Sequence, residues 1–288
     1  MNGKILANIR GVYVVHVNGI NYNVVSRGHL RHENKILLVG DNVIFDDENL
    51  VIEDVLERKN ELIRPKSANI DEMFVAMSLK EPDYSLELIY KFLTYANMNN
   101  IKSSVVLTKA DLVTDFTEIN KLKEDLKKVN VKTYIISPKD EKSINELKEA
   151  FKGKTSIIMG QTGVGKSTLM NEIDPSFNRL VGEYSTALNR GKHKTKEVIL
   201  CPYEDGFIGD TPGFSSLELD LFKEDLAKFF PGYESYYLNC YFSDCLHQNE
   251  KDCKIKEEIE KNNLSKDAYE VYLKLLNELP YRKERYKR

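Results

Sequence analysis

Apolar positions in the first sixty residues fall in short runs that are rich in β-branched and aromatic side chains. Glycine and asparagine turns separate these runs, and this pattern predicts strands. Five short strands of this kind suit a small closed barrel of the oligonucleotide-binding (OB) type. Such a barrel either contacts RNA or only packs on its neighbour, and the pattern does not decide between the two. The expected strands are residues 5–9, 12–17, 22–25, 36–45 and 50–55, and the candidate RNA contacts are Arg27, Arg31 and Lys35.

From about residue 66 the hydrophobic period alternates between that of strands and that of helices. Alternation of this kind predicts a mostly parallel sheet with helices on both faces. Ligands are then expected at the carboxyl ends of the strands. The expected strands are residues 72–79, 105–107, 133–136 and 155–159, and the expected helices are residues 86–96, 117–129, 143–151 and 166–173.

The rest of the chain divides into a polar stretch, two more strands and a helical end. Residues 175–197 hold few apolar side chains and predict a mobile loop, and strands are expected at 198–201 and 206–208. Residues 254–279 have helical spacing, with Ser265 as the expected N-cap of the last helix. We therefore expect an OB-type β-barrel at 1–65, an α/β domain at 66–219 and a mostly helical domain at 220–288.

Composition narrows the class of protein without naming a function. The chain is 41% hydrophobic, which suffices for a sizeable core, and its net charge is −3. Since no global positive charge draws it to nucleic acid, any RNA contact depends on local patches. No apolar run approaches the roughly 18 residues that a membrane span needs, and polar residues interrupt the N-terminus where a signal peptide would be apolar. A cytoplasmic protein with no membrane contact is expected.

Residues 160–167, Gly-Gln-Thr-Gly-Val-Gly-Lys-Ser, fit the phosphate-loop pattern between a predicted strand and a predicted helix. Glycines bring backbone N–H groups close to phosphate oxygens, and the helix N-terminus favours the same anion. Lys166 is expected to reach the β- and γ-phosphates, while the Ser167 hydroxyl binds Mg²⁺. The alternative is a glycine-rich turn that binds nothing, which the flanking strand and helix disfavour. The expected nucleotide contacts are Gly160, Gln161, Thr162, Gly163, Val164, Gly165, Lys166, Ser167 and Thr168.

The tetrapeptide Thr-Lys-Ala-Asp at 108–111 follows a predicted strand and is similar to the guanine motif Asn-Lys-x-Asp. A carboxylate at Asp111 accepts hydrogen bonds from guanine N1–H and the 2-amino group, which adenine does not offer, so GTP is favoured over ATP. Lys109 is expected to lie along the base and ribose. Thr108 lacks the amide of the usual Asn, so we expect looser local bracing. Ser137, which precedes Pro138, is the candidate from a second base-contacting loop, and a surface turn is the alternative for the whole motif.

Magnesium has two further candidate ligands. Asp210 begins an Asp-x-x-Gly motif, and we expect its carboxylate to hold Mg²⁺ through water while the Gly213 N–H senses the γ-phosphate. Thr195 lies in the predicted loop and is the candidate switch threonine that closes on Mg²⁺ and the γ-phosphate. The alternative for this segment is a solvated basic loop without a nucleotide partner.

Three of the four cysteines gather near the C-terminus in the spacing Cys-x4-Cys-x-His-x5-Cys. Soft thiolates and one imidazole in a compact loop suit tetrahedral Zn²⁺, and four protein ligands make the site structural rather than catalytic. Free buried cysteines are the alternative. The expected ligands are Cys240, Cys245, His247 and Cys253, whereas Cys201 is expected to be a core thiol.

The guanine motif precedes the phosphate loop, although most regulatory GTPases have these motifs in the opposite order. This circular rotation, together with Asp-Thr-Pro-Gly at 210–213, resembles the circularly permuted ribosome-assembly GTPases of the RsgA (YjeQ/YloQ) family. The resemblance extends over nearly the whole chain and includes residues 69–72 and 81–85. The family's switch segment is Gly-Arg-His-Thr-Thr-Thr, and residues 191–196 keep only the central threonine, which is Thr195.

This resemblance implies hydrolysis of GTP to GDP and phosphate, zinc ligands at the matching positions, rRNA binding, and a late step of small (30S) ribosomal subunit assembly. It also supports His193 as a catalytic group beside Lys166 and Thr195, because Phe214 stands where many GTPases have a water-orienting glutamine. A plain surface histidine is the alternative. The basic and aromatic terminus at 281–288 is a candidate rRNA contact or a solvated tail. We expect a monomer.

Two rival functions belong to other classes. One is a nucleotide-regulated RNA-binding module with little hydrolysis of its own, which the intact Lys166, Ser167, Thr195 and Asp210 argue against. The other is an ATP-driven enzyme such as a small-molecule kinase, which Asp111 argues against. The rotated order also has a mechanical consequence, because the chain passes directly from Gly213 into the C-terminal region, which is expected to respond to loss of the γ-phosphate.

Overall fold

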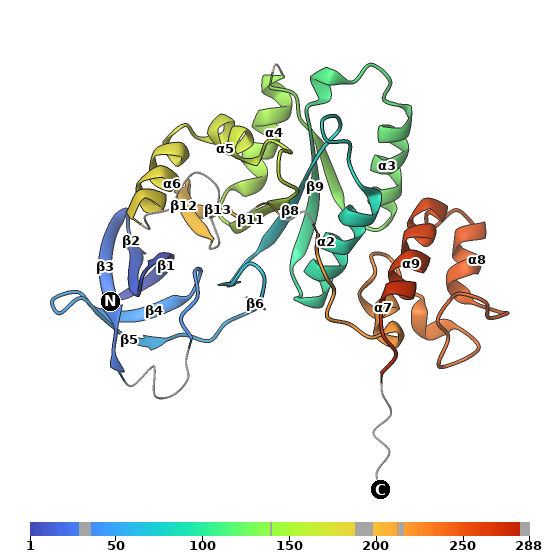
Figure 1. Cartoon of the computed structure of the whole chain (residues 1–288), viewed down its shortest axis with the longest axis horizontal. Coiled ribbons are helices and arrows are strands. Elements are labelled where there is room, and N and C mark those ends of the chain that lie inside the picture. The colour runs from blue at the N-terminus through green and yellow to red at the C-terminus, as the bar shows by residue number, and fades with distance from the viewer. Residues whose placement is uncertain (29–35, 139, 188–197, 212, 214–215, 283–288) are drawn as a thin grey trace, which may run out of the picture.

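The computed structural model describes residues 1–28, 36–138, 140–187, 198–211, 213 and 216–282. A β-barrel, a sheet covered by helices and a helical region follow one another along the chain (Figure 1). The expected fold class is therefore confirmed.

The N-terminal barrel is closed, with its strands in the order β1-β2-β3-β5-β4. Buried side chains alternate along β4, where Val43 and Phe45 point inward, whereas Ile5, Leu6 and Ala7 of β1 are all buried where the register of its pairing with β2 shifts. Strand β1 pairs with both β2 and β4, and β3 joins β5 in parallel to complete the closure. The strands are β1 (Asn2–Ile9), β2 (Val12–Val17), β3 (Ile20–Ser26), β4 (Asn42–Asp46) and β5 (Val51–Val55).

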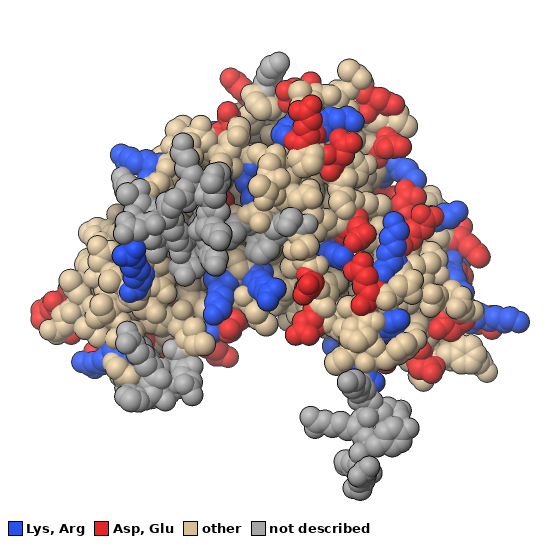
Figure 2. Space-filling model, in the orientation of Figure 1, with Lys and Arg blue, Asp and Glu red and all other residues tan. Residues whose placement is uncertain are grey.

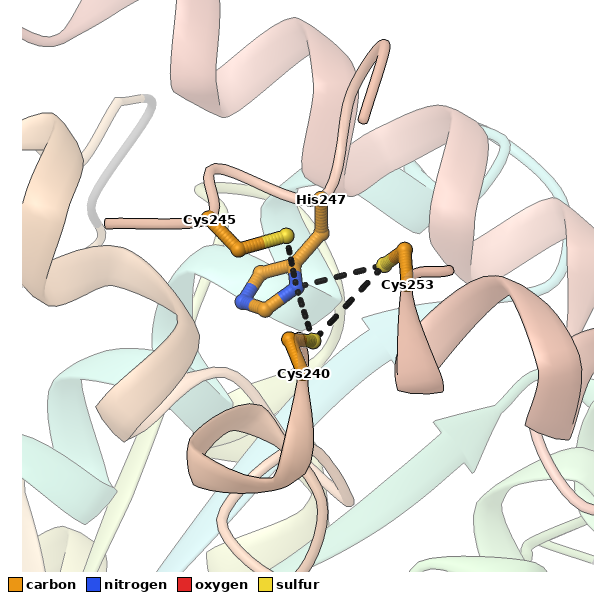
Figure 3. Close-up of side chains that lie close together, drawn as sticks. All are labelled: Cys240, Cys245, His247 and Cys253. Atoms are coloured by element: carbon orange, nitrogen blue, oxygen red, sulfur yellow. Dashed lines mark hydrogen bonds between the residues drawn. The ribbon is translucent and has the colours of Figure 1, made fainter. Parts of the chain in front are cut away.

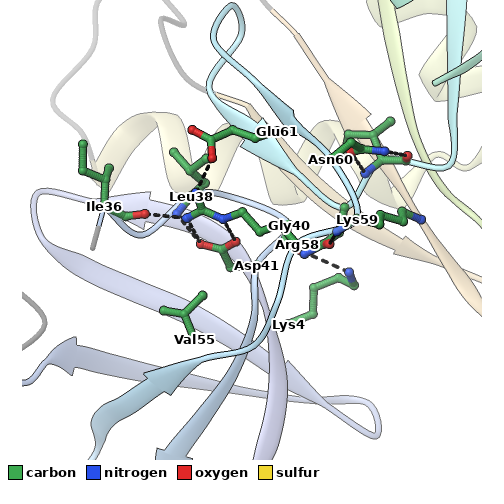
Figure 4. Close-up of polar contacts among 12 residues, drawn as sticks. Lys4, Ile36, Leu38, Gly40, Asp41, Val55, Arg58, Lys59, Asn60 and Glu61 are labelled. Atoms are coloured by element: carbon green, nitrogen blue, oxygen red, sulfur yellow. Dashed lines mark hydrogen bonds and ion pairs between the residues drawn. The ribbon is translucent and has the colours of Figure 1, made fainter. Parts of the chain in front are cut away.

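The expected strand at 36–45 is wrong over its first half, because only Asn42–Asp46 forms β4. Leu37, Leu38 and Val39 are buried in a loop that the Asp41 carboxylate organises. This carboxylate accepts the Leu38 N–H at 2.7 Å and two hydrogen bonds from Arg58, Nε to Oδ1 at 2.7 Å and Nη2 to Oδ2 at 2.8 Å (Figure 4). Gly40 has a φ of +93°, which a strand does not accommodate.

A linker connects the barrel to the sheet through the small hairpin β6 (Glu61–Leu62) and β7 (Ser67–Ala68). The sheet has the strand order β10-β9-β8-β11-β13-β12, and β12 alone among these pairs antiparallel. This agrees with the predicted mostly parallel sheet. The strands are β8 (Glu72–Ser78), β9 (Lys102–Thr108), β10 (Lys132–Ile135), β11 (Thr155–Gly160), β12 (Ile199–Tyr203) and β13 (Gly206–Asp210).

Helices cover both faces of the sheet, and the alternation along β8 shows how the two faces are shared. Met73, Val75 and Met77 pack into the core beneath α2 and α3, whereas Phe74 and Ala76 pack into the core beneath α4, α5 and α6. A strand buried on both faces is continuously apolar, as this one is. The helices are α2 (Leu86–Met98), α3 (Thr117–Lys128), α4 (Glu141–Phe151), α5 (Lys166–Ile173) and α6 (Ser176–Ala187).

Helix α6 corrects the prediction of a loop over residues 175–197. Phe177 is buried, and Leu180 and Val181 pack against the same core, so three apolar positions at helical spacing supply the hydrophobic stripe. The stripe is narrow because polar residues fill the rest of the helix, and for that reason the sequence suggested a loop. The remainder of that predicted loop, residues 188–197, lies outside the described residues.

The C-terminal region contains α7 (Lys223–Phe229), a 3₁₀ turn (Tyr237–Asn239), α8 (Lys254–Glu260) and α9 (Lys266–Glu278). It packs on α2, where the rings of Tyr90 and Phe230 stack with centroids 5.1 Å apart. Ser265 caps α9 as predicted, since its hydroxyl accepts the Ala268 N–H at 3.4 Å. The same hydroxyl donates to Asp125 of α3 at 2.6 Å, so the cap also joins the two regions.

Candidate functional site

The phosphate-loop segment connects the end of β11 to the start of α5, at the carboxyl edge of the sheet. Gly163 and Gly165 have φ angles of +85° and +89°, so the loop depends on glycine at both turns. Gly160 is constrained for a different reason, because a Cβ there would lie 2.0 Å from the carbonyl oxygen of Ala76 on β8. The glycine spacing that predicted this loop therefore has a local steric cause at each position.

Lys166 lies folded across the loop and is buried. Its Nζ donates to the carbonyl oxygens of Gly160 and Gln161, both at 2.8 Å. Burial lowers the pKa of Lys166 to about 8, against the attraction of Asp210. Burial also raises the pKa of the Asp210 carboxyl, which Lys166 partly offsets. An anion entering the loop would offset this lowering of the Lys166 pKa by supplying an opposite charge.

The guanine-motif segment is joined directly to the phosphate loop. The Thr108 hydroxyl contacts the carbonyl oxygen of Val164 at 2.6 Å and that of Met77 on β8 at 3.3 Å. The shorter contact is the stronger hydrogen bond. We expected looser local bracing because Thr108 lacks the amide of the usual Asn. In the structure, the Thr108 hydroxyl makes a bracing contact with a residue 56 positions away in the sequence.

A pocket of about 90 Å³ lies between these two segments. Lys109 and Thr108 line it from one side, and Gly165 and Thr168 from the other. Asp111 is exposed in the 3₁₀ turn Ala110–Leu112 that follows Lys109. The chain after β10 completes the wall, since the Ala110 N–H donates to the Ile136 carbonyl at 3.1 Å and brings Ser137 and Pro138 beside the guanine motif.

The Asp-x-x-Gly segment reaches the same loop from β13. The Thr211 hydroxyl donates to the Ile158 carbonyl at 2.6 Å, which fixes the turn after Asp210. Gly213 packs so closely on the phosphate loop that a Cβ would lie 2.4 Å from the Thr162 hydroxyl. The predicted residues Thr195 and His193 lie outside the described residues, as does Phe214.

One segment beside the site was noticed in the sequence only through the family resemblance. The turn after β8 brings the Glu81 carbonyl to the Lys109 ammonium, which donates to it, and places Pro82 next to Gly163. The topology explains this position, because β8 lies between β9 and β11, the two strands that carry the motifs. The central position of β8 in the sheet would have indicated that the turn after it lies beside the site. The order of strands, however, cannot be inferred from a single sequence.

The four predicted zinc ligands converge (Figure 3). Nδ1 of His247 lies 3.4 Å from the sulfur atoms of Cys240, Cys245 and Cys253, and the sulfurs of Cys240 and Cys253 lie 3.9 Å apart. Tetrahedral Zn²⁺ with its usual bond lengths requires S···N edges of about 3.5 Å and S···S edges of about 3.8 Å. The spacing of the ligand atoms therefore fits zinc.

Neighbouring groups hold this loop in the ligating geometry. The Tyr269 hydroxyl donates to the His247 carbonyl at 2.8 Å, and the Glu250 carboxylate accepts the N–H groups of Leu246 and Gln248, both at 2.8 Å. Burial lowers the pKa of His247 to about 4, so the imidazole is neutral, as a metal ligand must be. Cys201 is buried on β12, apart from this cluster, in agreement with its prediction as a core thiol.

The structure describes only some of the candidate RNA contacts. Arg27 forms an ion pair with Glu53 at 3.3 Å, while Arg31, Lys35 and residues 283–288 lie outside the described residues. Figure 2 shows Lys and Arg side chains interspersed with Asp and Glu over the face in view. Among the helices that the structure describes, none has the length and apolar character needed to cross a bilayer.

Comparison with known families gives two matches. The family model of the RsgA GTPase matches residues 55–220, and that of the RsgA N-terminal domain matches residues 2–51. Together they cover the barrel except for residues 52–54 of β5, the linker and the whole sheet. The first of these models alone accounts for more than half of the chain.

Individual proteins match along their full length. The small ribosomal subunit biogenesis GTPase RsgA 2 of Listeria innocua is 38% identical, over 99% of this chain and 100% of that protein. RsgA of Enterococcus faecalis is 35% identical, over 100% of this chain and 98% of that protein. Among solved structures, YjeQ from Thermotoga maritima superposes with a TM-score of 0.84 at 32% identity, covering 98% of this chain and 99% of that one. YloQ, a circularly permuted GTPase, gives 0.81 at 32% identity, covering 99% and 96%.

Proposed function

The chain belongs to the RsgA family of GTPases that act in small ribosomal subunit biogenesis, and on that premise we propose how its own residues bind and hydrolyse GTP. It is a GTP hydrolase, and the RNA-binding module with little hydrolysis is not the favoured reading. Asp111 reads the guanine edge, with Lys109 along the base and ribose and Ser137 in the adjoining loop. The loop at 160–167 holds the phosphates.

Hydrolysis in this site depends on positioning and charge, since phosphoryl transfer asks little covalent chemistry of the protein. Lys166 leaves the carbonyls of Gly160 and Gln161 and reaches the β- and γ-phosphates, where its charge stabilises the transition state. The Gly213 N–H faces the γ-phosphate, a role supported by the packing of Gly213 on Thr162. Thr195 and His193 complete the catalytic set from the switch segment.

The family implies Mg²⁺ as well as GTP and GDP. Ser167 at the exposed start of α5, Asp210 at the end of β13 and Thr195 are hydroxyl and carboxylate donors of the kind that Mg²⁺ prefers, and Asp210 acts through water. When bound, the ion neutralises charge that develops on the phosphate oxygens. Cys240, Cys245, His247 and Cys253 hold one structural Zn²⁺, which takes no part in hydrolysis.

The observation that carries the nucleotide site is the hydrogen bond from Thr108 to the Val164 carbonyl. It joins the segment that selects the base to the segment that binds the phosphates, so one purine nucleotide can occupy both. The two segments come from β9 and β11, with β8 between them. A site assembled in this way distinguishes GTP from ATP at Asp111. This selection of guanine argues against the alternative of an ATP-driven enzyme such as a small-molecule kinase.

The partner that we propose is the small ribosomal subunit with its rRNA, in the cytoplasm, with the protein acting as a monomer. The names of the relatives support the subunit. The domain bounds 1–65, 66–219 and 220–288 are part of the proposal, and the family matches at 2–51 and 55–220 support the first two. The basic terminus and the Arg27, Arg31 and Lys35 group are the proposed rRNA contacts.

The decisive experiment measures phosphate release from GTP and from ATP, each with and without purified small subunits. We expect slow release from GTP alone, a strong increase with subunits, and no comparable release from ATP. The Lys166→Ala variant is expected to abolish the stimulated rate. Equal turnover of ATP, or no turnover of GTP with subunits present, would contradict the proposal.

A further inference from the structure

The loop that follows β10 meets the guanine motif with a proline. Pro138 is exposed and lines the pocket together with Thr108, Lys109 and Gly165. Its position is fixed from within the sheet, because the Ile136 N–H donates to the Leu107 carbonyl at 2.8 Å and the Ala110 N–H donates to the Ile136 carbonyl at 3.1 Å. The ends of β9 and β10 are adjacent, and these two hydrogen bonds hold Pro138 beside Thr108 and Lys109.

Proline differs from every other residue at such a position because it has no backbone N–H. The loop can present the Pro138 ring and carbonyl to a ligand, but it cannot donate a hydrogen bond from residue 138. The neighbouring pocket wall is apolar, formed by Ile136, Ile144 and Leu169. This side of the pocket accommodates a purine by contact rather than by donating hydrogen bonds.

The order of polar atoms on guanine determines which of them faces this wall. The 2-amino group, N1–H and the 6-keto oxygen follow one another along one edge of the base. When Asp111 accepts from the first two, the keto oxygen is the next polar atom beyond the carboxylate on the same edge of the base, and we place it on the side of the adjacent loop. That loop is the one that carries Ser137 and Pro138, since Ala110 beside Asp111 is hydrogen-bonded to Ile136.

We propose that Pro138, which has no backbone N–H, gives the 6-keto oxygen of guanine no hydrogen bond, so that the contacts of Asp111 with N1–H and the 2-amino group alone select the base. The inference rests on the proposed guanine site and specifies which atoms of the base are read. Pro138 then determines specificity because it has no backbone N–H to donate to position 6 of the base. The chain accepts guanine analogues altered at position 6 provided that N1–H and the 2-amino group remain.

The test compares three nucleotides by equilibrium binding to the full chain at neutral pH. 6-Thio-GTP keeps N1–H and the 2-amino group but replaces the keto oxygen by sulfur, a weak acceptor. Inosine triphosphate keeps the keto oxygen and N1–H but loses the 2-amino group. We expect 6-thio-GTP to bind within about twofold of GTP, and inosine triphosphate to bind at least about tenfold more weakly, since hydrogen bonds to a carboxylate are strong.

The matched variant is Pro138→Ala, which restores a backbone N–H at an exposed position. A neutral hydrogen bond changes affinity by about two- to twelvefold, so this variant is expected to bind GTP and inosine triphosphate more tightly by that factor. The affinity for 6-thio-GTP is expected not to change. Pro138→Gly also restores the N–H while altering loop stiffness differently, so agreement between the two variants separates the hydrogen bond from a loop effect.

Each outcome bears on a different claim. If the native chain prefers GTP over 6-thio-GTP by tenfold or more, another group reaches the keto oxygen and the inference is wrong. It is equally wrong if both variants leave the GTP to 6-thio-GTP ratio unchanged. If GTP shows no preference over inosine triphosphate or ATP, the proposed guanine site itself fails, and the inference fails with it.

Discussion

At the scale of single residues, the nucleotide site is organised by small side chains rather than by charged ones. The Thr108 hydroxyl spans from the guanine motif to Val164, and Gly160 and Gly213 allow backbone segments to approach where any Cβ would collide. These contacts position the loop on which Lys166 depends. Loss of the Thr108 contact is expected to weaken nucleotide binding without altering any group that touches the phosphates.

Thr108→Val removes the hydroxyl and keeps the shape of the side chain. The buried Val164 carbonyl then loses its partner, which costs about 1–3 kcal/mol, and we expect affinity for both GDP and GTP to fall about tenfold. Thr108→Ser keeps the hydroxyl and is expected to bind within about threefold of the native chain. Nucleotide titration measures both. A loss in Thr108→Ser as large as that in Thr108→Val, or larger, would contradict the leading role of the hydrogen bond.

Gly160→Ala places a methyl group against the Ala76 carbonyl, where the ideal Cβ position is 2.0 Å from the oxygen. We expect β11 and β8 to separate locally and GTP binding to be lost. Gly182→Ala on α6 is the control, because its Cβ meets nothing within 4 Å and alanine favours helix by about 1 kcal/mol. Gly182→Ala should therefore raise the temperature of thermal unfolding and leave the nucleotide titration unchanged, whereas Gly160→Ala should lower both stability and affinity.

At the scale of elements, the zinc-ligand loop replaces a hydrophobic core. Residues between the 3₁₀ turn and α8 form no long helix or strand, and Leu238 and Tyr241 are 77% and 78% exposed. A segment with so little buried apolar surface needs another source of order, and the proposed zinc site would provide it. Tyr269 of α9 links this loop to the helices.

Cys245→Ser removes one thiolate from the expected tetrahedron. We expect the bound zinc, measured by atomic absorption, to fall well below one ion per chain, and the region from the 3₁₀ turn to α8 to lose more than about 3 kcal/mol of stability. The control is Asp244→Ser, an exposed neighbour whose carboxylate is not among the four converging ligands. Zinc content unaffected in Cys245→Ser would remove this residue from the metal site.

At the scale of the whole molecule, the α/β domain that carries the proposed nucleotide site is contacted from both sides. The barrel reaches the sheet at Phe207 of β13, where the His16 ring lies edge-on at 5.7 Å, three positions before Asp210. The C-terminal region is attached through α3, where Lys121 and Asp267 form an ion pair at 2.5 Å. The chain also runs from Gly213 to the buried Leu217 and on to α7.

This connection predicts a response to the state of the nucleotide. Loss of the γ-phosphate releases Gly213, and we expect faster hydrogen exchange over residues 216–230 with GDP than with a non-hydrolysable GTP analogue. In Gly213→Ala, the added methyl group meets Thr162, so the difference between nucleotides should disappear. Identical exchange over residues 214–260 in both states of the native chain would contradict the coupling.

The sequence by itself predicted the fold class, the phosphate loop, the guanine motif and the zinc ligands. Each of these follows from the spacing of residues that lie close together in the sequence. It was wrong about residues 36–41 and about α6, where Asp41 pairing with Arg58 and the burial of Phe177 overrode the local pattern. Only the tertiary structure decided that Thr108 meets Val164, that Pro138 borders the pocket between the guanine motif and the phosphate loop, and that the Glu81 carbonyl meets Lys109. Such contacts depend on the order of strands in the sheet, which long-range pairing sets and no local pattern encodes.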